Sequence, residues 1–410
     1  MRVLITDAGS RIALAALRSL GGRGFEVHVM GSRHGQACFH SRHCKGRILH
    51  PPPERDYAAF TRRLRSVVGR GGFDVLLPMS DWSVVAASRH REELSACTAV
   101  VVPGWDALMV TREKSRTLAV AEQLGIEVPR TFLPADRTEL REVAARVPYP
   151  CVIKLRRGAG AKGLRYADDA EELLDRYRDE PARSDVVFDY ALPLVQEYVP
   201  GEVHDVCVLF DRGEPVAALT QRRIKTWPVA AGRGILDETT DEPELKEKAF
   251  RLLRRIGWHG PAQVEFKRDA RTGRYLLMEV NGRFWGALAL SVRAGVDFPY
   301  LACRMARGKP VEGVAEYPVG LRYVWVVPFA LAHLVAGPAR LRSLGQFLWA
   351  AAKGGCEIRL SDPLPTLVAM AYSVGGLRRL LKDGRLQERG PGGSQGRRGG
   401  RSTCSSPASR

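Results

Sequence analysis

Two glutamates have the residue type and the spacing of a metal-binding pair. Glu265 and Glu279 lie in segments 263–267 and 274–281, and a three-residue turn, 271–273, with glycine last predicts a β-hairpin. If Thr272 is the midpoint, the two glutamates face each other, since each lies seven residues from it. Directly opposed residues have Cβ atoms about 4.5–5.5 Å apart. Two carboxylates at that distance repel unless a cation lies between them, and oxygen ligands of this kind suit Mg²⁺.

Other polar side chains share the faces of this hairpin. Side chains alternate along a strand, so Asn281 lies on the face of Glu279, and Gln263 lies on the face of Glu265. The alternative is an exposed hairpin whose charges simply face water. Apolar residues interleaved with the polar ones indicate that the strands are packed, namely Val264, Phe266, Leu277, Met278 and Val280. The sequence therefore favours a metal-binding hairpin.

Composition indicates a globular protein with a basic charge. The chain has 410 residues, enough for two or three domains, and 45% of them are hydrophobic. The net charge of +18 would favour anionic partners, but part of it comes from residues 385–410, which are predicted to form a disordered basic tail. The other basic residues are spread thinly, so no specific nucleic acid partner is expected. Eight cysteines without a C-x-x-C pair, and a first segment that is typical of a strand, favour a cytoplasmic location.

Residues 1 to about 108 alternate between strand and helix patterns. Short β-branched runs occur at 3–5, 26–30, 74–77 and 98–102, with segments of helical spacing between them. This order is typical of a parallel sheet with helices on its faces. Asp81 follows the strand predicted at 74–77, at the edge of the sheet where ligands bind in open α/β folds. Two interpretations are equally open: Asp81 contacts a substrate, or it is the N-cap of the next helix.

A lysine and a glycine-rich loop predict a phosphate-binding element. Residues 149–154 read as a strand that ends in Lys154, and Gly158, Gly160 and Gly163 follow it. Backbone N–H groups of such a loop approach phosphates closely, and lysine supplies positive charge. The loop does not match the Walker A pattern, and a flexible surface turn is the alternative interpretation.

Three later segments carry polar groups or apolar runs that bear on function. Residues 194–202 read as a strand ending in a Pro-Gly turn flanked by acids, which suits a nucleoside as well as it suits an ordinary hairpin. Arg222, Arg223 and Lys225 are predicted to form a mobile basic patch for a carboxylate or phosphate. Residues 323–336 are apolar but too short to span a bilayer, so burial is expected rather than membrane contact.

Taken in order, these motifs resemble the ATP-grasp superfamily, in particular its carbamoyl-phosphate-synthase-large-subunit-like and carboxylate–amine ligase members. The ordered set comprises Lys114 opening a helix, GIEVP at 125–129, the lysine with its glycine loop, QEYVPGE at 196–202 and E-x-N-x-R at 279–283. The resemblance covers residues 1 to about 310. It implies an α/β and α+β architecture with a Rossmann-like pre-ATP domain at 1–108, an ATP-grasp small subdomain at 109–193, a large subdomain with the Mg-ATP site at 194–310 and an unassigned C-terminal extension at 311–384.

The resemblance also implies roles for individual residues. Contacts to the ATP phosphates would come from Lys114, Lys154, Gly158, Gly160 and Gly163. The adenine and ribose would be held by Gln196, Glu197, Val199 and Glu202. Mg²⁺, or Mn²⁺ in its place, would be held by Glu265, Glu279 and Asn281. Catalysis would involve Arg283 on the transferring phosphoryl group, with Arg222 and Arg223 on the acceptor carboxylate.

The implied reaction is an ADP-forming ligation. A carboxylate attacks the γ-phosphoryl group of ATP, and an amine then displaces phosphate from the acyl-phosphate to form an amide. The expected partners are small, amino-acid-like carboxylates and amines, and a second copy of the chain in a homodimer. The alternatives are an ATP-grasp carboxylase, a carbamoyl-phosphate-type enzyme and a non-catalytic nucleotide-binding or nucleic-acid-binding protein. The sequence does not identify the carboxylate or the amine.

Overall fold

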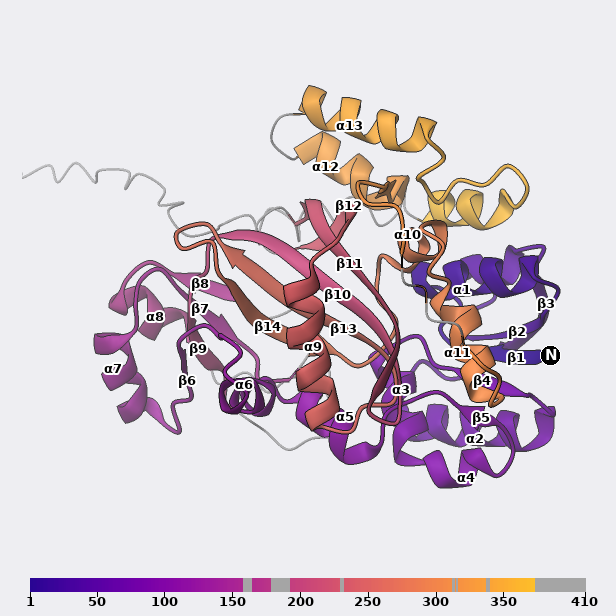
Figure 1. Cartoon of the computed structure of the whole chain (residues 1–410), viewed down its shortest axis with the longest axis horizontal. Coiled ribbons are helices and arrows are strands. Elements are labelled where there is room, and N and C mark those ends of the chain that lie inside the picture. Colours follow the sequence, from indigo (N-terminus) through magenta and orange to yellow (C-terminus); the bar gives the residue numbers. More distant parts are fainter. Residues whose placement is uncertain are drawn as a thin grey trace, which may run out of the picture.

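Three β-sheets organise the chain (Figure 1). The computed structural model describes residues 1–157, 164–177, 192–228, 232–311, 314, 316–336 and 340–372. The architecture is mixed α/β, with a parallel sheet followed by two antiparallel sheets, which confirms the predicted fold class. The glycine loop at 158–163 and the predicted tail at 385–410 lie outside the described residues.

A five-stranded parallel sheet with helices on both sides forms the first hundred residues. Its strand order is β3-β2-β1-β4-β5, with β1 (Arg2–Ile5), β2 (Glu26–Gly31), β3 (Cys44–Leu49), β4 (Val75–Leu77) and β5 (Ala99–Val100). The helices are α1 (Arg11–Gly22), α2 (Tyr57–Gly71), α3 (Asp81–Arg89) and α4 (Arg91–Ser95), and a 3-10 turn, η1 (Ala37–His40), precedes β3. Alternate side chains of β1 face opposite layers: Val3 and Ile5 pack toward α1, and Leu4 packs toward α2.

A four-stranded antiparallel sheet follows, in the order β6-β9-β7-β8. Its strands are β6 (Thr131–Phe132), β7 (Cys151–Lys154), β8 (Arg165–Ala167) and β9 (Leu194–Glu197), and α7 (Arg137–Arg146) and α8 (Ala170–Arg176) pack on it. Two helices precede this sheet, α5 (Trp105–Arg112) and α6 (Lys114–Gln123). Lys114 is the first residue of α6, as the sequence predicted, and an extended backbone at Glu113 separates α6 from α5.

A six-stranded antiparallel sheet in the order β14-β13-β10-β11-β12-β15 carries the hairpin. Its strands are β10 (Gly201–Asp211), β11 (Glu214–Trp227), β12 (Arg233–Thr240), β13 (Gly260–Asp269), β14 (Tyr275–Asn281) and β15 (Arg322–Val324). One face packs on α9 (Pro243–Arg255) through Val206, Val208 and Phe210. The other face packs, through Cys207 and Leu209, on α1, α10 (Leu288–Arg293) and α11 (Phe298–Ala306). The large sheet therefore shares its core with the N-terminal sheet.

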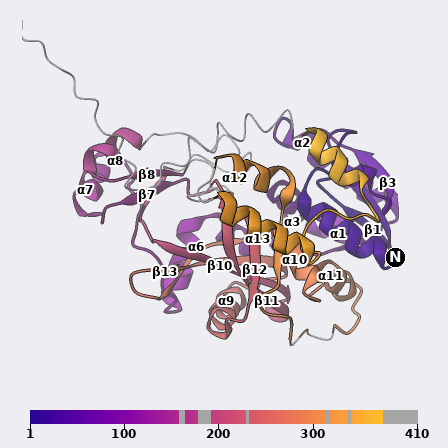
Figure 2. The same ribbon diagram turned by 90° about the horizontal axis from the view of Figure 1, so that it is seen from above.

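The C-terminal extension covers one edge of the large sheet. It contains an irregular helical turn, η2 (Val326–Ala330), α12 (Leu331–Ala336), α13 (Arg340–Ala352) and a last helical segment at 364–372. Figures 1 and 2 show α12 and α13 side by side near β12. Both helices share an apolar core with β12 and β15. Arg18 of α1 anchors the extension, since its Nε lies 2.9 Å from Asp362 Oδ2 and its Nη1 donates to the Glu357 carbonyl at 2.7 Å.

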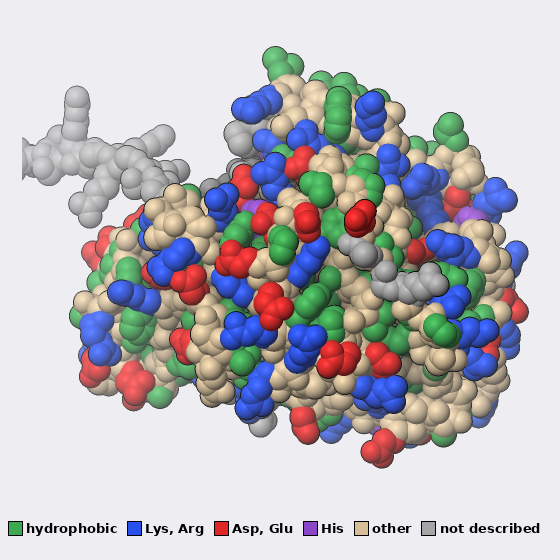
Figure 3. Space-filling model, in the orientation of Figure 1, with side chains coloured by type: hydrophobic (Ala, Val, Ile, Leu, Met, Phe, Trp, Pro, Cys, Tyr) green, Lys and Arg blue, Asp and Glu red, His purple; other side chains and the backbone are tan. Residues whose placement is uncertain are grey.

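Charge is dispersed over the visible surface, where Lys and Arg side chains are interspersed with Asp and Glu (Figure 3). In the part of the chain that the structure describes, no helix has both the length and the apolar character needed to cross a bilayer.

Candidate active site

The hairpin has the predicted register. Glu265 pairs with Glu279, and Gln263 pairs with Asn281, across β13 and β14. The predicted three-residue turn is wrong: the closing hydrogen bond runs from Asp269 N to the Arg274 carbonyl at 2.8 Å, so residues 270–273 form a four-residue turn. A register shift directly after Glu265 compensates for the extra residue. The glutamates therefore oppose each other although the turn differs.

Both glutamates of the pair lie in a polar, largely buried setting and meet cations. Lys114 Nζ lies 3.3 Å from Glu279 Oε2, and the Arg223 guanidinium contacts Glu265. Asn281 Nδ2 donates to Glu279 Oε1 at 3.1 Å. Burial and the neighbouring carboxylate raise the pKa of Glu265, although Arg223 opposes them. Burial also disfavours ionised Glu279, but Lys114 and Asn281 outweigh it and lower the pKa of Glu279.

The donor set of the hairpin fits a hard divalent cation such as Mg²⁺. It offers two carboxylates and the amide oxygen of Asn281, all oxygen ligands. Among the described residues no group of three or more His, Cys, Asp or Glu side chains is placed to hold a metal ion by itself. An ion at Glu265 and Glu279 would therefore complete its shell with oxygens that are not carboxylates of this chain, as Mg²⁺ does with phosphates and water.

Lys154 stands at the end of β7 and faces the same cavity as the glutamate pair. Its Nζ donates to Gln196 Oε1 at 2.6 Å, and Gln196 Nε2 donates to Thr131 Oγ1 at 2.8 Å. Burial lowers the pKa of Lys154 to about 8, and Glu279 opposes this effect. The side chain of Gln196 is buried and outside the cavity lining, so the structure places it as a support for Lys154.

The segment predicted to hold adenine and ribose lines the cavity beside Lys154. Glu197 accepts from Arg130 N at 3.1 Å, and the Val199 carbonyl accepts from Lys267 Nζ at 2.6 Å. Glu202 is exposed at the rim, 3.4 Å from Arg222 Nη1. Sequence reasoning missed Lys267, although its spacing of two from Glu265 along one strand was an available signal.

The three predicted catalytic arginines do not gather in one place. Residues 222–227 belong to β11, so the predicted mobile basic patch is wrong, and Lys225 pairs there with β12. Arg223 lines the cavity and binds Asp205 at 2.8 Å. Arg222 is its neighbour in the strand and points to the other face, where its Nε donates to Glu238 at 2.8 Å. The structure therefore separates Arg222 from Arg223.

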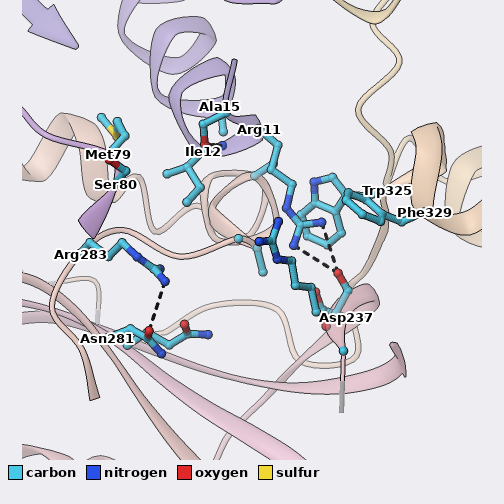
Figure 4. A pocket seen from close by; sticks show the side chains of 18 of the residues that line it. Arg11, Ile12, Ala15, Met79, Ser80, Asp237, Asn281, Arg283, Trp325 and Phe329 are labelled. Carbon is cyan, nitrogen blue, oxygen red and sulfur yellow. Dashed lines mark hydrogen bonds between the residues drawn. The ribbon is translucent and has the colours of Figure 1, made fainter. Parts of the chain in front are cut away.

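Arg283 joins the hairpin to the N-terminal sheet. Its Nη2 donates to Asn281 Oδ1 at 3.2 Å (Figure 4). Its Nε donates to Asp81 Oδ2 at 3.0 Å. Ser80 caps α3, so the interpretation of Asp81 as the N-cap is wrong, and its carboxylate faces the cavity instead. Asp81 and Arg283 thus connect the N-terminal sheet to the large sheet at the site.

One cavity of about 1730 Å³ is lined by Asp81, Lys114, Lys154, Arg223, Glu265, Glu279, Asn281 and Arg283, whereas Gln196 and Arg222 lie outside its lining. It continues away from the hairpin, between α1, β12 and the C-terminal extension. Figure 4 shows Arg11, Asp237, Trp325 and Phe329 together on one side of it, across from Asn281 and Arg283. No sequence motif predicted this second end of the cavity.

Comparison with known proteins identifies relatives over part of the chain. Biotin carboxylase 1 of Bacillus subtilis is 24% identical over 301 residues, which are 69% of this chain and 64% of that protein. The N-terminal section of the carbamoyl phosphate synthase large chain of Methanopyrus kandleri is 24% identical over 242 residues, 56% of this chain and 42% of that protein. The chain spans from 19% to 64% of the length of four such curated relatives.

A solved structure shares the fold. The biotin carboxylase domain of the 2-oxoglutarate carboxylase of Hydrogenobacter thermophilus, in complex with MgADP and bicarbonate, superposes with a TM-score of 0.63 at 17% identity, over 78% of this chain and 73% of that one. The resemblance to the ATP-grasp superfamily is confirmed, and the chain has the ATP-grasp fold. Within that class, residues 191–328 match the family model described as ATP-grasp in the biosynthetic pathway with Ter operon.

Proposed function

We propose that this protein is an ATP-dependent ligase that activates a carboxylate as an acyl-phosphate and joins it to an amine. The observation that carries the proposal is the opposed pair Glu265 and Glu279, which shares one cavity with Lys114, Lys154 and Arg283. Two acids and three cations around one space suit a metal-bound triphosphate, because the acids hold the metal and the metal and cations together offset most of the phosphate charge.

Different side chains of the site have different roles in phosphoryl transfer. Glu265, Glu279 and the Asn281 oxygen would hold Mg²⁺, which when bound supplies charge neutralisation at the phosphates. Lys114 gives up its contact with Glu279 and turns to a phosphate oxygen, while Lys154 remains oriented by Gln196. Arg283 is fixed by Asp81 and is held beside the hairpin, where charge develops on the transferring group.

The reaction balances in two steps. An oxygen of the carboxylate substrate attacks the γ-phosphorus, and the bond to the β–γ bridging oxygen breaks, which releases ADP and leaves an acyl-phosphate. The amine nitrogen then attacks the acyl carbon, loses a proton, and inorganic phosphate leaves with the C–O bonding electrons. No side chain needs to form a covalent bond, so the protein acts by positioning and by electrostatics.

An ADP-release screen tests the proposal. Pairs of carboxylates and amines are incubated with Mg-ATP, and the products are identified by mass spectrometry. We expect ADP formation that requires both a carboxylate and an amine, with one amide formed per ADP. ADP formation that never depends on an amine, or a product that lacks the amine nitrogen, would reject the ligase.

An ATP-dependent carboxylase is the second candidate. The observation in its favour is that two of the relatives described above are biotin carboxylases, one of them solved with bicarbonate. This reaction would show bicarbonate-dependent ADP release and incorporation of labelled bicarbonate into product. The same screen, run with and without bicarbonate in buffers freed of carbon dioxide, separates the two candidates.

A further inference from the structure

The end of the cavity remote from the hairpin is a second polar pocket with an aromatic wall. Arg11, the first residue of α1, lies over the Trp325 ring, with its guanidinium carbon 4.4 Å from the ring centroid and 5.8 Å from that of Phe329. Both of its terminal nitrogens lie 3.3 Å from the Gly234 carbonyl. The guanidinium is therefore held in a defined place beside the aromatic wall (Figure 4).

The positive charge of Arg11 has no carboxylate partner within ion-pair distance among the described residues. Burial lowers the pKa of Arg11 to about 10, and Arg233 adds to this effect, although Asp237 opposes it. The side chain stays protonated at neutral pH in a setting that disfavours its charge. An anionic ligand that approached the guanidinium would relieve this imbalance.

The carboxylate of Asp237 in β12 lines the same pocket, and it too lacks part of its hydrogen bonding among the described residues. Its side chain is 1% exposed and lines the cavity, and its Oδ1 has no hydrogen-bond partner in the described part of the chain. A Cβ on Gly234 would lie 2.1 Å from that oxygen, so glycine there leaves room for the carboxylate. A buried acceptor atom without a partner costs free energy unless a ligand supplies a donor.

The pocket is connected to the glutamate pair by one row of polar residues on the large sheet. Asp237 pairs with Arg223 across β11 and β12, Arg223 contacts Glu265, and Glu265 pairs with Glu279. Strands lie about 4.8 Å apart, so β12 is three spacings, about 14 Å, from β13 at the backbone. Side chains extend from both strands into the cavity, so the space left between its two ends has about the length of a small substrate molecule.

We propose that this pocket binds the amine substrate, and that this substrate is a free amino acid with an apolar or aromatic side chain. The assignment rests on the proposed ligase function. The carboxylate of the amino acid pairs with Arg11, its amino group donates to Asp237 Oδ1, and its side chain lies against Trp325 and Phe329. The amino group then stands on the side nearer to Arg223 and the glutamate pair, where the acyl-phosphate forms.

Binding measurements test the site separately from catalysis. The twenty free amino acids are titrated by calorimetry into the full-length protein with and without Mg-ADP, followed by the decarboxylated and the N-acetylated forms of the best binder. We expect the wild type to prefer the free amino acid over either analogue by about tenfold or more. Equal affinity for all three forms, or no binding of any amino acid, would overturn the proposal.

Substitutions of Arg11 and Asp237 test the two proposed contacts with the carboxylate and the amino group of the ligand. Arg11→Gln is expected to weaken binding of the amino acid about tenfold or more and to leave the decarboxylated amine unchanged. Asp237→Asn is expected to remove the preference over the N-acetylated form. Arg212→Gln and Asp241→Asn are matched controls, because both residues are exposed and lie outside the cavity lining. Arg11→Lys keeps the charge without the planar fork, and supplies an intermediate result if Arg11→Gln unfolds.

The outcomes separate this proposal from the ligase itself. Amine-dependent ADP release with an unchanged amino acid preference in Arg11→Gln and Arg11→Lys would reject the pocket and keep the ligase. Arg11-dependent binding of an amino acid without any amine-dependent ADP release would keep the pocket and reject the ligase.

Discussion

The two ends of the cavity differ in how their charged side chains are paired. At the hairpin, each glutamate already meets a cation of the protein, Lys114 for Glu279 and Arg223 for Glu265. At the remote end, Arg11 stacks on an aromatic ring without a carboxylate partner among the described residues, and Asp237 keeps an oxygen without a donor. The glutamates at the hairpin end are therefore balanced by cations before any ligand binds, whereas the remote end is unbalanced in the part of the chain that the structure describes.

This difference indicates how each end would respond to its ligand. At the balanced end, a nucleotide and its metal must exchange partners with side chains that are already paired, so binding there costs the loss of existing contacts. At the unbalanced end, a ligand adds partners to groups that lack them. Loss of a charge should therefore damage the first end more than the second, and the following predictions test that order.

The largest effect is expected from Glu279→Gln. The substitution removes one carboxylate of the pair while Lys114 and Asn281 keep hydrogen-bonding groups nearby, so the fold should persist. We expect ADP formation to fall by about 10²–10³-fold or more, as for the loss of a key electrostatic group. Turnover at saturating Mg-ATP is the measurement, with circular dichroism as the control. Wild-type ADP formation in this variant would exclude the metal assignment.

Arg223→Ala and Arg11→Ala compare the two ends by stability. Without Arg223, the buried Asp205 loses a cation at 2.8 Å, and such a loss costs about 3–5 kcal/mol. Without Arg11, stacking and packing are lost but no ion pair, which costs about 1–2 kcal/mol. Urea unfolding of both variants measures the difference. Arg223→Ala should also change KM or kcat, and unchanged kinetics would remove it from the active site.

Asp237 should make stability depend on pH. Burial raises the pKa of Asp237 to about 7, against about 3.9 for an unfolded aspartate. Between these values the native protein binds a proton that the unfolded chain releases, so the free energy of unfolding should fall by a few kcal/mol as pH rises through this window. Asp237→Asn should lose this slope, which unfolding curves at pH 5 and pH 7.5 would detect. An identical slope in both proteins would contradict the pKa.

The smallest effect is expected from Lys154, whose loss of charge at alkaline pH should weaken nucleotide binding. Because burial lowers the pKa of Lys154 to about 8, its charge is lost as pH rises above that value. The KM for ATP is then expected to rise by about threefold to tenfold between pH 7.5 and pH 9. Lys154→Arg stays charged, so its KM should remain flat over this range. A parallel rise in both proteins would point to another group.

The glutamate pair at the hairpin end could be predicted from the sequence because its pairing is local. Glu265 and Glu279 oppose each other through strand alternation and one turn, and Lys154 precedes a recognisable loop. The turn length was predicted wrongly, yet the bulge after Glu265 restored the register. Arg222 shows a different error: once β11 is recognised as a strand, alternation alone places Arg222 and Arg223 on opposite faces.

The remote end could not be predicted because its residues meet only in the folded chain. Arg11 opens an ordinary helix, Asp237 lies in an ordinary strand, and Trp325 belongs to an apolar run that indicates burial. Nothing in their local sequences links them. Their meeting depends on the packing of α1 against the large sheet and on the anchoring of the extension by Arg18 and Asp362.

The position of Trp325 and Phe329 along the chain has an evolutionary consequence. Both follow Arg283, the last of the residues assigned to the phosphates and the metal. Mutation or recombination in the extension could therefore exchange one acceptor preference for another without altering how ATP is used. The Arg18–Asp362 ion pair is the junction that such an exchange would have to preserve. A lineage could diversify its products through changes in the extension at 311–384 alone.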